Sequence, residues 1–470
     1  MKKLIPVLIL ISLLLVAGCP SINGRPPEFS VSNPNIVPDG LGGLIVAYQV
    51  NEGNTGFTYL QRLGVNGDTL WGEKGVELNS DSWGFLGSSE VECVPLVSGG
   101  KGNFVTVYTS KDGLWIQKLD MEGNPIWPAS KIRVSDTIPP PGYFRAVSDN
   151  SNGAIIVWSA GQNSIELQRI DGEGGLLWNT IISVEVDRFD IAGDASSNTF
   201  VMWKDNPAYS EGNIFVQKVD ANGRVAWSTG GLELTKEQNP GYVGGSFDHR
   251  IICDGDGGAL CIWVQANLSK DGREITGFAL HVQRINSEGE MLWEPGGVLI
   301  TEMMRAQEPR IIGSNPDYAL VFWEDMHIVY TQKIDILGNS FWPGTGLEIA
   351  QASNIVYYSV ADDGAGGAVV VWNCSESGHK YLLAQHLDSE GAKLWGDNGI
   401  KVSTVSPYWA GYSIPARISS DGTGDFVIAW ASGNNIKDKT SSYIQRISTE
   451  GKLLWGENGI ELSPWAGGEE

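Results

Sequence analysis

The sequence predicts an all-β protein, an eight-bladed β-propeller with four antiparallel strands in each blade. Three observations support this fold class. A frame of Gln, Gly six residues later and Trp ten residues later occurs eight times in the chain. Short apolar runs alternate with turns rich in Gly, Asp and Asn, and glycine provides 60 of the 470 residues. No long stretch has the period of an amphipathic helix.

Each repeat unit contains four predicted strands in a fixed order. Strand a is a short apolar segment that ends at an Asp/Gly turn, as in the stretch HRIICDGDGG. Strand b follows and ends in an aromatic residue, and strand c carries the Gln. Strand d follows the Gly and carries the Trp. The strand-b aromatics are Tyr48, Tyr108, Trp158, Trp203, Trp263, Trp323, Trp372 and Trp430.

The Gln/Gly/Trp frame is complete in all eight units. The Gln positions are Gln61, Gln117, Gln168, Gln217, Gln283, Gln332, Gln385 and Gln445. The Gly positions are Gly67, Gly123, Gly174, Gly223, Gly289, Gly338, Gly391 and Gly451. The Trp positions are Trp71, Trp127, Trp178, Trp227, Trp293, Trp342, Trp395 and Trp455. The residue after the Gln is basic in seven units and is His386 in the other.

These recurring residues are expected to serve the fold. A Gln inside a strand can bury its amide when both ends find hydrogen-bond partners. A Trp ring can fill the wedge between adjacent blades, and the Gly predicts a turn with positive φ. A residue that every blade contains is explained by what every blade needs. Functional residues should therefore be those that differ between blades.

Stacking the units in a closed ring buries the apolar faces of strongly twisted four-stranded sheets. We expect blade 8 to close onto blade 1 by packing and sheet edges, without a shared strand, because the last unit ends with GIELSPWAGGEE. The strand-d pattern G-x-x-x-W resembles the tryptophan-docking repeat of eight-bladed quinoprotein-type propellers. That group includes the lipoprotein scaffold of the outer-membrane assembly machinery. The resemblance implies the ring architecture, although the spacing from Asp335 to Gly338 is one residue tighter than in that family.

The chain begins with a predicted targeting segment. Lys2 and Lys3 precede an apolar run over residues 4–16 that is too short for a good membrane-spanning helix. The stretch VAGC that ends at Cys19 resembles the lipobox of bacterial lipoproteins, which implies lipidation of Cys19. The alternative is an ordinary secretory signal. We expect a signal peptide at 1–18, a lipidated tether at 19–31, one propeller at 32–465 and a tail at 466–470.

Composition limits the classes of partner. The formal net charge of −23 argues against binding nucleic acid or an anionic bilayer through net charge. No His/Cys cluster has the spacing of a metal site, and we predict no metal and no cofactor. Cys253 and Cys261 flank a predicted turn, a spacing compatible with a disulfide or with free buried thiols. We expect a monomer in the cell envelope, held to the membrane through Cys19 and facing the extracytoplasmic side.

The two faces of the ring should differ. The a–b and c–d turns are short and uniform and define the turn face, whereas the b–c and d–a loops define a variable loop face. Variable loops on a rigid scaffold are the usual place for binding. Aromatic residues of the loop face are Trp83, Phe85, Tyr143, Phe144, Tyr242, Phe247, Tyr408, Trp409 and Tyr412. They suit a protein or sugar surface, unless they fold back over the blades as local caps.

Four arginines form a sharper pattern. Each lies 13 residues before the strand-b aromatic of its unit, and they are Arg145, Arg250, Arg310 and Arg417. The other units hold Asn35, Pro95, Asp190 and Ser359 at this position. If strand a is innermost, the guanidiniums stand near the channel mouth and could receive a carboxylate, a phosphate or an acidic loop. The alternative is that each arginine pairs with an acidic residue of the adjacent blade.

The sequence contains no recognised catalytic signature. GxSxG, HExxH and P-loop motifs are absent, and residues 254–257 lack the outer ligands of a calcium loop. We therefore expect a membrane-anchored, non-enzymatic binding or scaffold propeller for a protein, peptide or glycan. The alternative is a carbohydrate-active enzyme, a glycosidase or lyase, with carboxylates at the channel mouth. A redox propeller with a quinone cofactor has no residue to support it.

Overall fold

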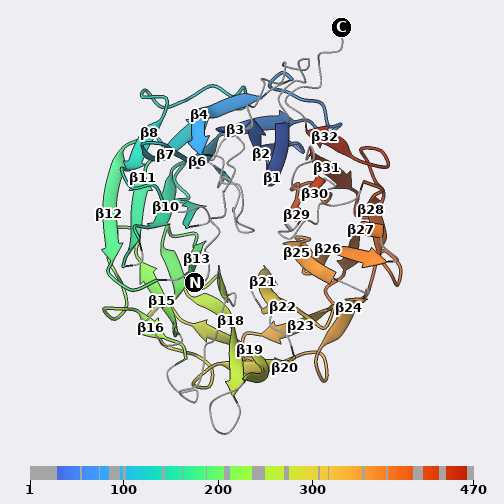
Figure 1. The fold of residues 1–470 in the computed structure, drawn as a ribbon. Coiled ribbons are helices and arrows are strands. Elements are labelled where there is room, and N and C mark those ends of the chain that lie inside the picture. Colours follow the sequence, from blue (N-terminus) through green and yellow to red (C-terminus); the bar gives the residue numbers. More distant parts are fainter. Residues whose placement is uncertain are drawn as a thin grey trace, which may run out of the picture.

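The computed structural model describes residues 29–52, 55–73, 75–83, 96–98, 102–139, 143–161, 163–186, 188–205, 212–235, 249–268, 275–304, 307–315, 317–351, 355–376, 379–405, 416–432 and 441–462. These residues form eight four-stranded antiparallel sheets around a ring (Figure 1). The predicted all-β, eight-bladed β-propeller is therefore confirmed. The described ranges contain strands but no helix, and thus no helix that could cross a membrane.

The blades follow the chain order. Blade 1 contains β1 (Phe29–Pro38), β2 (Leu44–Glu52), β3 (Thr55–Leu63) and β4 (Val76–Trp83), and blade 2 contains β5 (Leu96–Ser98), β6 (Phe104–Ser110), β7 (Gly113–Leu119) and β8 (Ile132–Ser135). Blade 3 contains β9 (Phe144–Ser148), β10 (Ala154–Ser159), β11 (Ile165–Ile170) and β12 (Leu176–Ile182), and blade 4 contains β13 (Arg188–Gly193), β14 (Thr199–Lys204), β15 (Ile214–Val219) and β16 (Leu232–Glu233). Blade 5 contains β17 (His249–Cys253), β18 (Ala259–Leu268), β19 (Ile275–Ile285) and β20 (Val298–Met303), and blade 6 contains β21 (Gln307–Asn315), β22 (Tyr318–Asp325), β23 (Ile328–Asp335) and β24 (Leu347–Gln351). Blade 7 contains β25 (Ile355–Asp362), β26 (Ala368–Glu376), β27 (His379–Leu387) and β28 (Ile400–Ser403), and blade 8 contains β29 (Arg417–Ser420), β30 (Phe426–Ser432), β31 (Ser441–Ile447) and β32 (Ile460–Leu462).

Strand order explains how the ring closes. In every blade the four strands are hydrogen-bonded in chain order, so no strand is shared between blades and the expected closure by packing is confirmed. The first strands of successive blades contact one another all the way round, from β1 and β5 to β29 and β1. They lie around the centre of the ring in Figure 1. Strand a is therefore the innermost strand of each blade.

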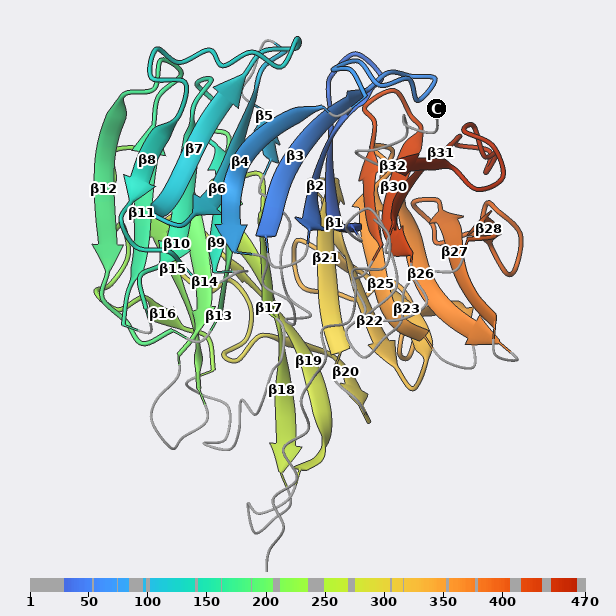
Figure 2. The same cartoon turned by 45° about the horizontal axis from the view of Figure 1, so that its top comes forward.

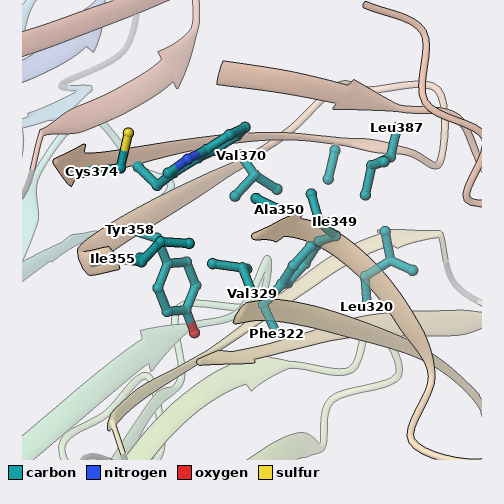
Figure 3. Packing of buried hydrophobic residues seen from close by; sticks show 12 residues of the cluster. Leu320, Phe322, Val329, Ile349, Ala350, Ile355, Tyr358, Val370, Cys374 and Leu387 are labelled. Atoms are coloured by element: carbon teal, nitrogen blue, oxygen red, sulfur yellow. The ribbon is translucent and has the colours of Figure 1, made fainter. Parts of the chain in front are cut away.

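The hydrophobic core is divided among the blade junctions. Eight buried clusters each combine residues of two successive blades, and the eighth joins blade 8 to blade 1. At the junction of blades 6 and 7, Phe322 and Ile349 of blade 6 pack with Val370 of blade 7 (Figure 3). Because the apolar faces meet face to face around a closed ring, neither end of the stack is left open.

The strand registers define the two faces. Asp325 pairs with Ile328 beside the b–c turn of blade 6, whereas β18 and β19 pair as far as Leu268 and Ile275. The longer hairpin of blade 5 projects beyond its neighbours on the loop face (Figure 2). β1 begins on that same face, because Phe29 pairs with Glu52 near the b–c turn. The chain thus enters the ring from the loop face.

Candidate functional site

In seven of the eight blades the buried Gln of the frame clamps, through hydrogen bonds, the segment that leads into strand d of its own blade, and Gln117 is the exception. The prediction that strand d carries the Trp is correct only for Trp178 in β12; in the other seven blades strand d begins five residues after the Trp. In blade 8, Gln445 Nε2 donates to the carbonyl of Gly456 at 2.6 Å. Its Oε1 accepts hydrogen bonds of 3.1 Å from the backbone N–H groups of Arg446 and Trp455. The same three contacts recur at Gln61, Gln217, Gln283 and Gln385. The expected satisfaction of both amide ends is confirmed at these five positions, where the partners are backbone groups of the same blade. Gln117 instead accepts a hydrogen bond of 3.5 Å from the hydroxyl of Tyr108.

The Trp of each frame docks on the next blade. Trp71 Nε1 donates to the carbonyl of Met121 at 2.9 Å. Equivalent hydrogen bonds join Trp127 to Gly172, Trp178 to Ala221, Trp227 to Ser287, Trp293 to Ile336, Trp395 to Thr449 and Trp455 to Val65. In each case the acceptor lies four residues after the Gln of the next blade. The predicted position of the Trp in the wedge between blades is confirmed.

The Gly of each frame receives the docking Trp. All eight frame glycines have φ between +80° and +90°, as predicted for this turn. A Cβ at Gly223 would lie 2.6 Å from the ring of Trp178 in the preceding blade. At every junction a Cβ on this glycine would approach the preceding Trp ring to 3.3 Å or less. Glycine is therefore required both by the backbone conformation and by the contact between blades.

The basic residue after the Gln is a second clasp between blades. Arg446 Nη1 donates to the carbonyls of Gly42 and Val65 at 3.0 Å, and its Nε donates to Asp425 at 3.0 Å. Hydrogen bonds to the next blade are made by Arg62, Lys118, Arg169, Lys218, Lys333, His386 and Arg446. The hydrogen bonds of Arg284 instead end on Asp254 and Asp256 of its own blade. The repeated side chains of the turn face are thus engaged in joining the blades.

The four arginines predicted as a site share one register position on the innermost strand. Arg145 pairs with Val157, Arg250 with Ile262, Arg310 with Phe322 and Arg417 with Ala429, in each case the residue before the strand-b aromatic. All four side chains are half-buried. We call these four residues the arginine row.

Three guanidiniums of the row bend toward the loop face. Nη1 donates to the preceding carbonyl in Arg145 (3.2 Å), Arg250 (2.8 Å) and Arg310 (3.4 Å). Strand a runs from the loop face to the turn face, so the preceding carbonyl lies nearer the loop face. Arg145 also lies over the ring of Phe189 in blade 4, at 5.7 Å from the centroid.

Other residues at this register position differ in chemistry. Asn35 and Ser359 occupy it in blades 1 and 7, and Asp190 occupies it in blade 4. Asp190 Oδ2 accepts a hydrogen bond of 3.1 Å from the backbone N–H of Ile251 in blade 5. Pro95 lies outside the described residues. The cationic side chains therefore lie in blades 3, 5, 6 and 8, with Asp190 between the first two of them.

The predicted loop-face aromatics are described only in part. Phe144 is buried in the core of the junction between blades 2 and 3, where it acts as a packing residue. Tyr143 is half-buried, and its carbonyl accepts a hydrogen bond from the N–H of Ser159 at 2.9 Å. Trp83 ends β4, and its side chain lies outside the described part of the structure. Phe85, Tyr242, Phe247, Tyr408, Trp409 and Tyr412 also lie outside it, as does Cys19.

The cysteines and the turn at residues 254–257 have structural roles. Cys253 and Cys261 are free thiols, and their register partners are Ala259 and Ile251 rather than each other. Burial raises the pKa of Cys253 to about 12 and also raises that of Cys261, so both stay protonated. Asp254 Oδ1 accepts hydrogen bonds from the N–H groups of Asp256 and Gly258, which forms an Asx turn. Within the described ranges no cluster of three His, Cys, Asp or Glu residues could hold a metal ion.

A position that the sequence interpretation missed lies two residues before each Gln. In five blades it carries a ring that stacks on the strand-b aromatic, with centroids 5.6 to 5.9 Å apart. These residues are Tyr59, Phe215, His281, Tyr330 and Tyr443. Blade 7 has Leu383 here, opposite Trp372. The eight Gln positions carry the signal, since this residue can be found by counting back from each one.

Comparisons with known proteins assign no family to this chain. No protein-family model matches the chain, and no curated protein matches it. Prolyl oligopeptidase B from Galerina marginata is 12% identical over 93% of this chain and 52% of its own, with a TM-score of 0.42. This chain therefore spans about half the length of that enzyme. A PL25 polysaccharide lyase, an ulvan lyase, is 10% identical over 78% of this chain and 94% of its own, with a TM-score of 0.45. The β-propeller domain of the Trilobed protease from Pyrococcus furiosus is 10% identical over 79% of this chain and 100% of its own, with a TM-score of 0.41.

Proposed function

We propose that this protein is a membrane-anchored extracytoplasmic lipoprotein whose propeller acts as a non-enzymatic binding scaffold. Its loop face receives an anionic group of a protein, peptide or glycan partner. The arginine row carries this proposal. Four guanidiniums share one register on the innermost strands of a chain whose formal net charge is −23. Guanidinium groups bind carboxylates and phosphates in a bidentate manner.

The division of labour between the faces supports the loop face as the binding surface. On the turn face the frame residues and the basic clasp residues are engaged with neighbouring blades, as shown for Trp455 and Arg446. The loop face carries the connections of variable length, among them the long hairpin of β18 and β19 (Figure 2). Binding sites lie preferentially on such loops, because a rigid scaffold positions them without fixing their sequence.

The direction of β1 suggests how the scaffold is presented. β1 starts at Phe29 on the loop face, about ten residues after the predicted lipidation site at Cys19. Ten extended residues span at most about 35 Å. A lipid anchor at Cys19 would therefore hold the loop face, rather than the turn face, toward the bilayer. The expected partner lies close to the membrane surface.

The anion-binding role is tested by titration calorimetry with a hexaglutamate peptide and with inorganic phosphate. The variant R145Q/R250Q/R310Q/R417Q should lose at least about tenfold in affinity, and salt should weaken binding to the wild-type protein. The control R133Q/R224Q removes two exposed arginines away from the inner ring and should bind normally. Unchanged affinity in the folded quadruple variant, or no binding of either probe to the wild type, would overturn the proposal.

The anchor is tested separately. The full-length protein should fractionate with membranes, and Cys19→Ser should release it into the soluble extracytoplasmic fraction, since one cysteine would carry the acyl chains. Metabolic labelling with a radioactive fatty acid should mark the wild type only. A soluble, unlabelled wild-type protein would contradict the anchor and leave the test of the arginine row unaffected.

The alternative carbohydrate-active enzyme rests on no described residue. Most glycosidases need two carboxylates that flank the scissile bond. Among the described positions of the inner register row, Asp190 is the one carboxylate, and its Oδ2 accepts a hydrogen bond from the backbone of Ile251. The enzyme therefore remains an alternative without a supporting observation, and the scaffold is the proposed function.

A further inference from the structure

A groove lies between blades 6 and 7 on the outer part of the ring, away from the arginine row. Its volume is about 850 Å³, within the range of small-molecule sites. Blade 6 contributes residues 348–351 of its outermost strand, β24. Blade 7 contributes residues of β26, β27 and β28 and of the turn between β27 and β28. Beneath the groove the junction is closed by packed residues that include Ile349, Ala350 and Cys374 (Figure 3).

The groove coincides with a departure from the repeat. In five blades the strand-b aromatic is covered by a stacked ring from strand c, as Trp430 is by Tyr443. In blade 7 the residue paired with Trp372 is Leu383. Leucine is shorter than tyrosine and has no flat ring, so the space above Trp372 is left partly open. Trp372 and Leu383 both line the groove.

Strand d of blade 7 departs from the repeat at the same level. Leu383 pairs with Lys401, whereas the matching residue of strand d is Glu77 in blade 1, Glu233 in blade 4, Glu348 in blade 6 and Glu461 in blade 8. The ammonium of Lys401 lies over the ring of Tyr381, 4.5 Å from its centroid. Blades 2, 3 and 5 have Arg133, Ile181 and Leu299 at this strand-d position. Two adjacent strands of blade 7 therefore differ from those of blades 1, 4, 6 and 8 where the groove opens, and those four blades build the same fold without Leu383 and Lys401.

The charges of the groove balance. Its lining includes two lysines, Lys393 and Lys401, and two acids, Glu348 and Asp397. Lys393 Nζ already donates to the carbonyl of Asp397 at 3.2 Å, and Lys401 is engaged by the Tyr381 ring. With no net charge and both ammoniums occupied, the groove is a poor trap for a strong anion. The arginine row, in contrast, brings four cationic side chains to one level of the ring and suits an anionic ligand.

The mixture of groups suits a ligand that is both donor and acceptor. Asp397 and Asn398 are exposed and can accept hydrogen bonds, and Asn398 and the lysines can donate them. Tyr381, Leu383 and Ile349 provide apolar surface beside these polar groups. Hydroxyl groups donate and accept, and the C–H face of a sugar ring packs on aromatic and aliphatic side chains. We propose that the groove between blades 6 and 7 binds a neutral saccharide.

Leu383→Tyr is the sharpest test, because it restores the ring that six other blades carry at this position. It should fill the groove while it preserves the fold. The probes are maltotetraose, cellotetraose, mannotetraose and chitotetraose, titrated by calorimetry and followed by the indole ¹H–¹⁵N resonances. The wild type should bind at least one of them with a Kd tighter than about 1 mM, and L383Y should weaken that binding at least about tenfold.

The repeat also offers a matched control. In blade 3 the residue opposite Trp158 is Glu166, so E166Y adds the same ring at the matching position of another junction. E166Y and the quadruple arginine variant should bind the saccharide normally. Failure of all four probes to bind the wild type, equal binding by L383Y, or equal loss in E166Y would each overturn the proposal. Loss in the quadruple arginine variant would also overturn it, because the binding would then belong to the inner ring.

Discussion

The indole Nε1 of Trp455 donates a hydrogen bond of 3.0 Å to the carbonyl oxygen of Val65, 390 residues earlier in the chain. The contact has the same geometry as the one between Trp395 and Thr449 at an internal junction, where the distance is 2.9 Å. The junction that closes the ring is therefore built from the same groups as the junctions between consecutive blades. Contacts of side chains close this ring, whereas other propellers are closed by a strand that two blades share.

Trp455→Phe should destabilise the protein as much as Trp395→Phe. Each change removes one hydrogen bond, which contributes about 0.5–1.5 kcal/mol to the free energy of unfolding, and each also leaves a small cavity. The acceptor carbonyls keep a second partner in both variants, Arg446 at Val65 and His386 at Thr449. Urea unfolding of the two variants measures the comparison. A loss at Trp395 with none at Trp455 would mean that the closing junction does not form in solution.

Gly223→Ala should cost more than Gly230→Ala. Both glycines have positive φ, +80° and +91°, so alanine costs about 1 kcal/mol at either position. A Cβ at residue 223 would also meet the Trp178 ring at 2.6 Å, whereas nothing lies within 4 Å of one at residue 230. The extra loss from overpacking should be about 1–3 kcal/mol. Equal melting temperatures for the two variants would refute the docking role of the frame glycine.

Gln445→Met should be among the most harmful single changes in the core. Gln445 makes three hydrogen bonds to the backbone of blade 8 and is fully buried. Methionine has a similar shape but cannot pair with the Trp455 N–H or the Gly456 carbonyl, and the loss should be about 2–4 kcal/mol. Among the described residues, Gln117 makes one side-chain hydrogen bond, of 3.5 Å from Tyr108, and Gln117→Met should cost less. Denaturant midpoints in the reverse order would contradict the clamp.

His281 should make the stability depend on pH. Burial, partly opposed by a hydrogen bond with Gly296, lowers the pKa of His281 to about 4. An unfolded histidine titrates near pH 6.5. Between about pH 6.5 and 4 the unfolded state gains a proton that the folded state does not, so the free energy of unfolding falls as pH falls. At about 1.4 kcal/mol for each pKa unit, the loss should reach about 3 kcal/mol at pH 4.

His281→Phe isolates this effect. The ring of His281 stacks on Trp263, and Phe215 stacks on Trp203 in the same way in blade 4. The variant should keep the stacking and lose the titration, so its unfolding free energy should vary less between pH 7 and 4. Carboxylates elsewhere contribute equally to both proteins. Parallel curves for the variant and the wild type would show that His281 is not shielded as the structure indicates.

The sequence allowed the ring to be predicted because its spacing is invariant. Counting from Gln to Gly and Trp identified the eight blades, and the positive φ of Gly67 and its counterparts followed from turn chemistry. It placed strand d too early, because in seven blades that strand begins five residues after the Trp. The contacts of the basic residue could not be predicted in this way. Arg446 reaches blade 1 and Arg284 stays in its own blade, although the two residues occupy the same place in the repeat. Whether this side chain reaches the next blade depends on the groups that the next blade places beside it. Those groups lie far away in the sequence or belong to a turn that differs between blades.

The candidate sites were predictable to different degrees. The arginine row was visible in the sequence, because a fixed distance from the strand-b aromatic becomes a fixed register in the sheet. The groove was not, because it depends on two strands at once. Leu383 is unremarkable in an apolar run until its pairing with Trp372 and Lys401 is known.

The chain order of the strands within each sheet leaves the ring without a privileged starting blade. β1 begins and β32 ends on the same face, and they belong to adjacent blades. A gene rearranged to join these ends and to open another d–a connection would rebuild every junction with its original hydrogen bonds. The fold should therefore accept circular permutation at any of its eight blade junctions. Insertion of a whole blade would likewise supply the Trp, the Gly and the basic residue that join it to its neighbours.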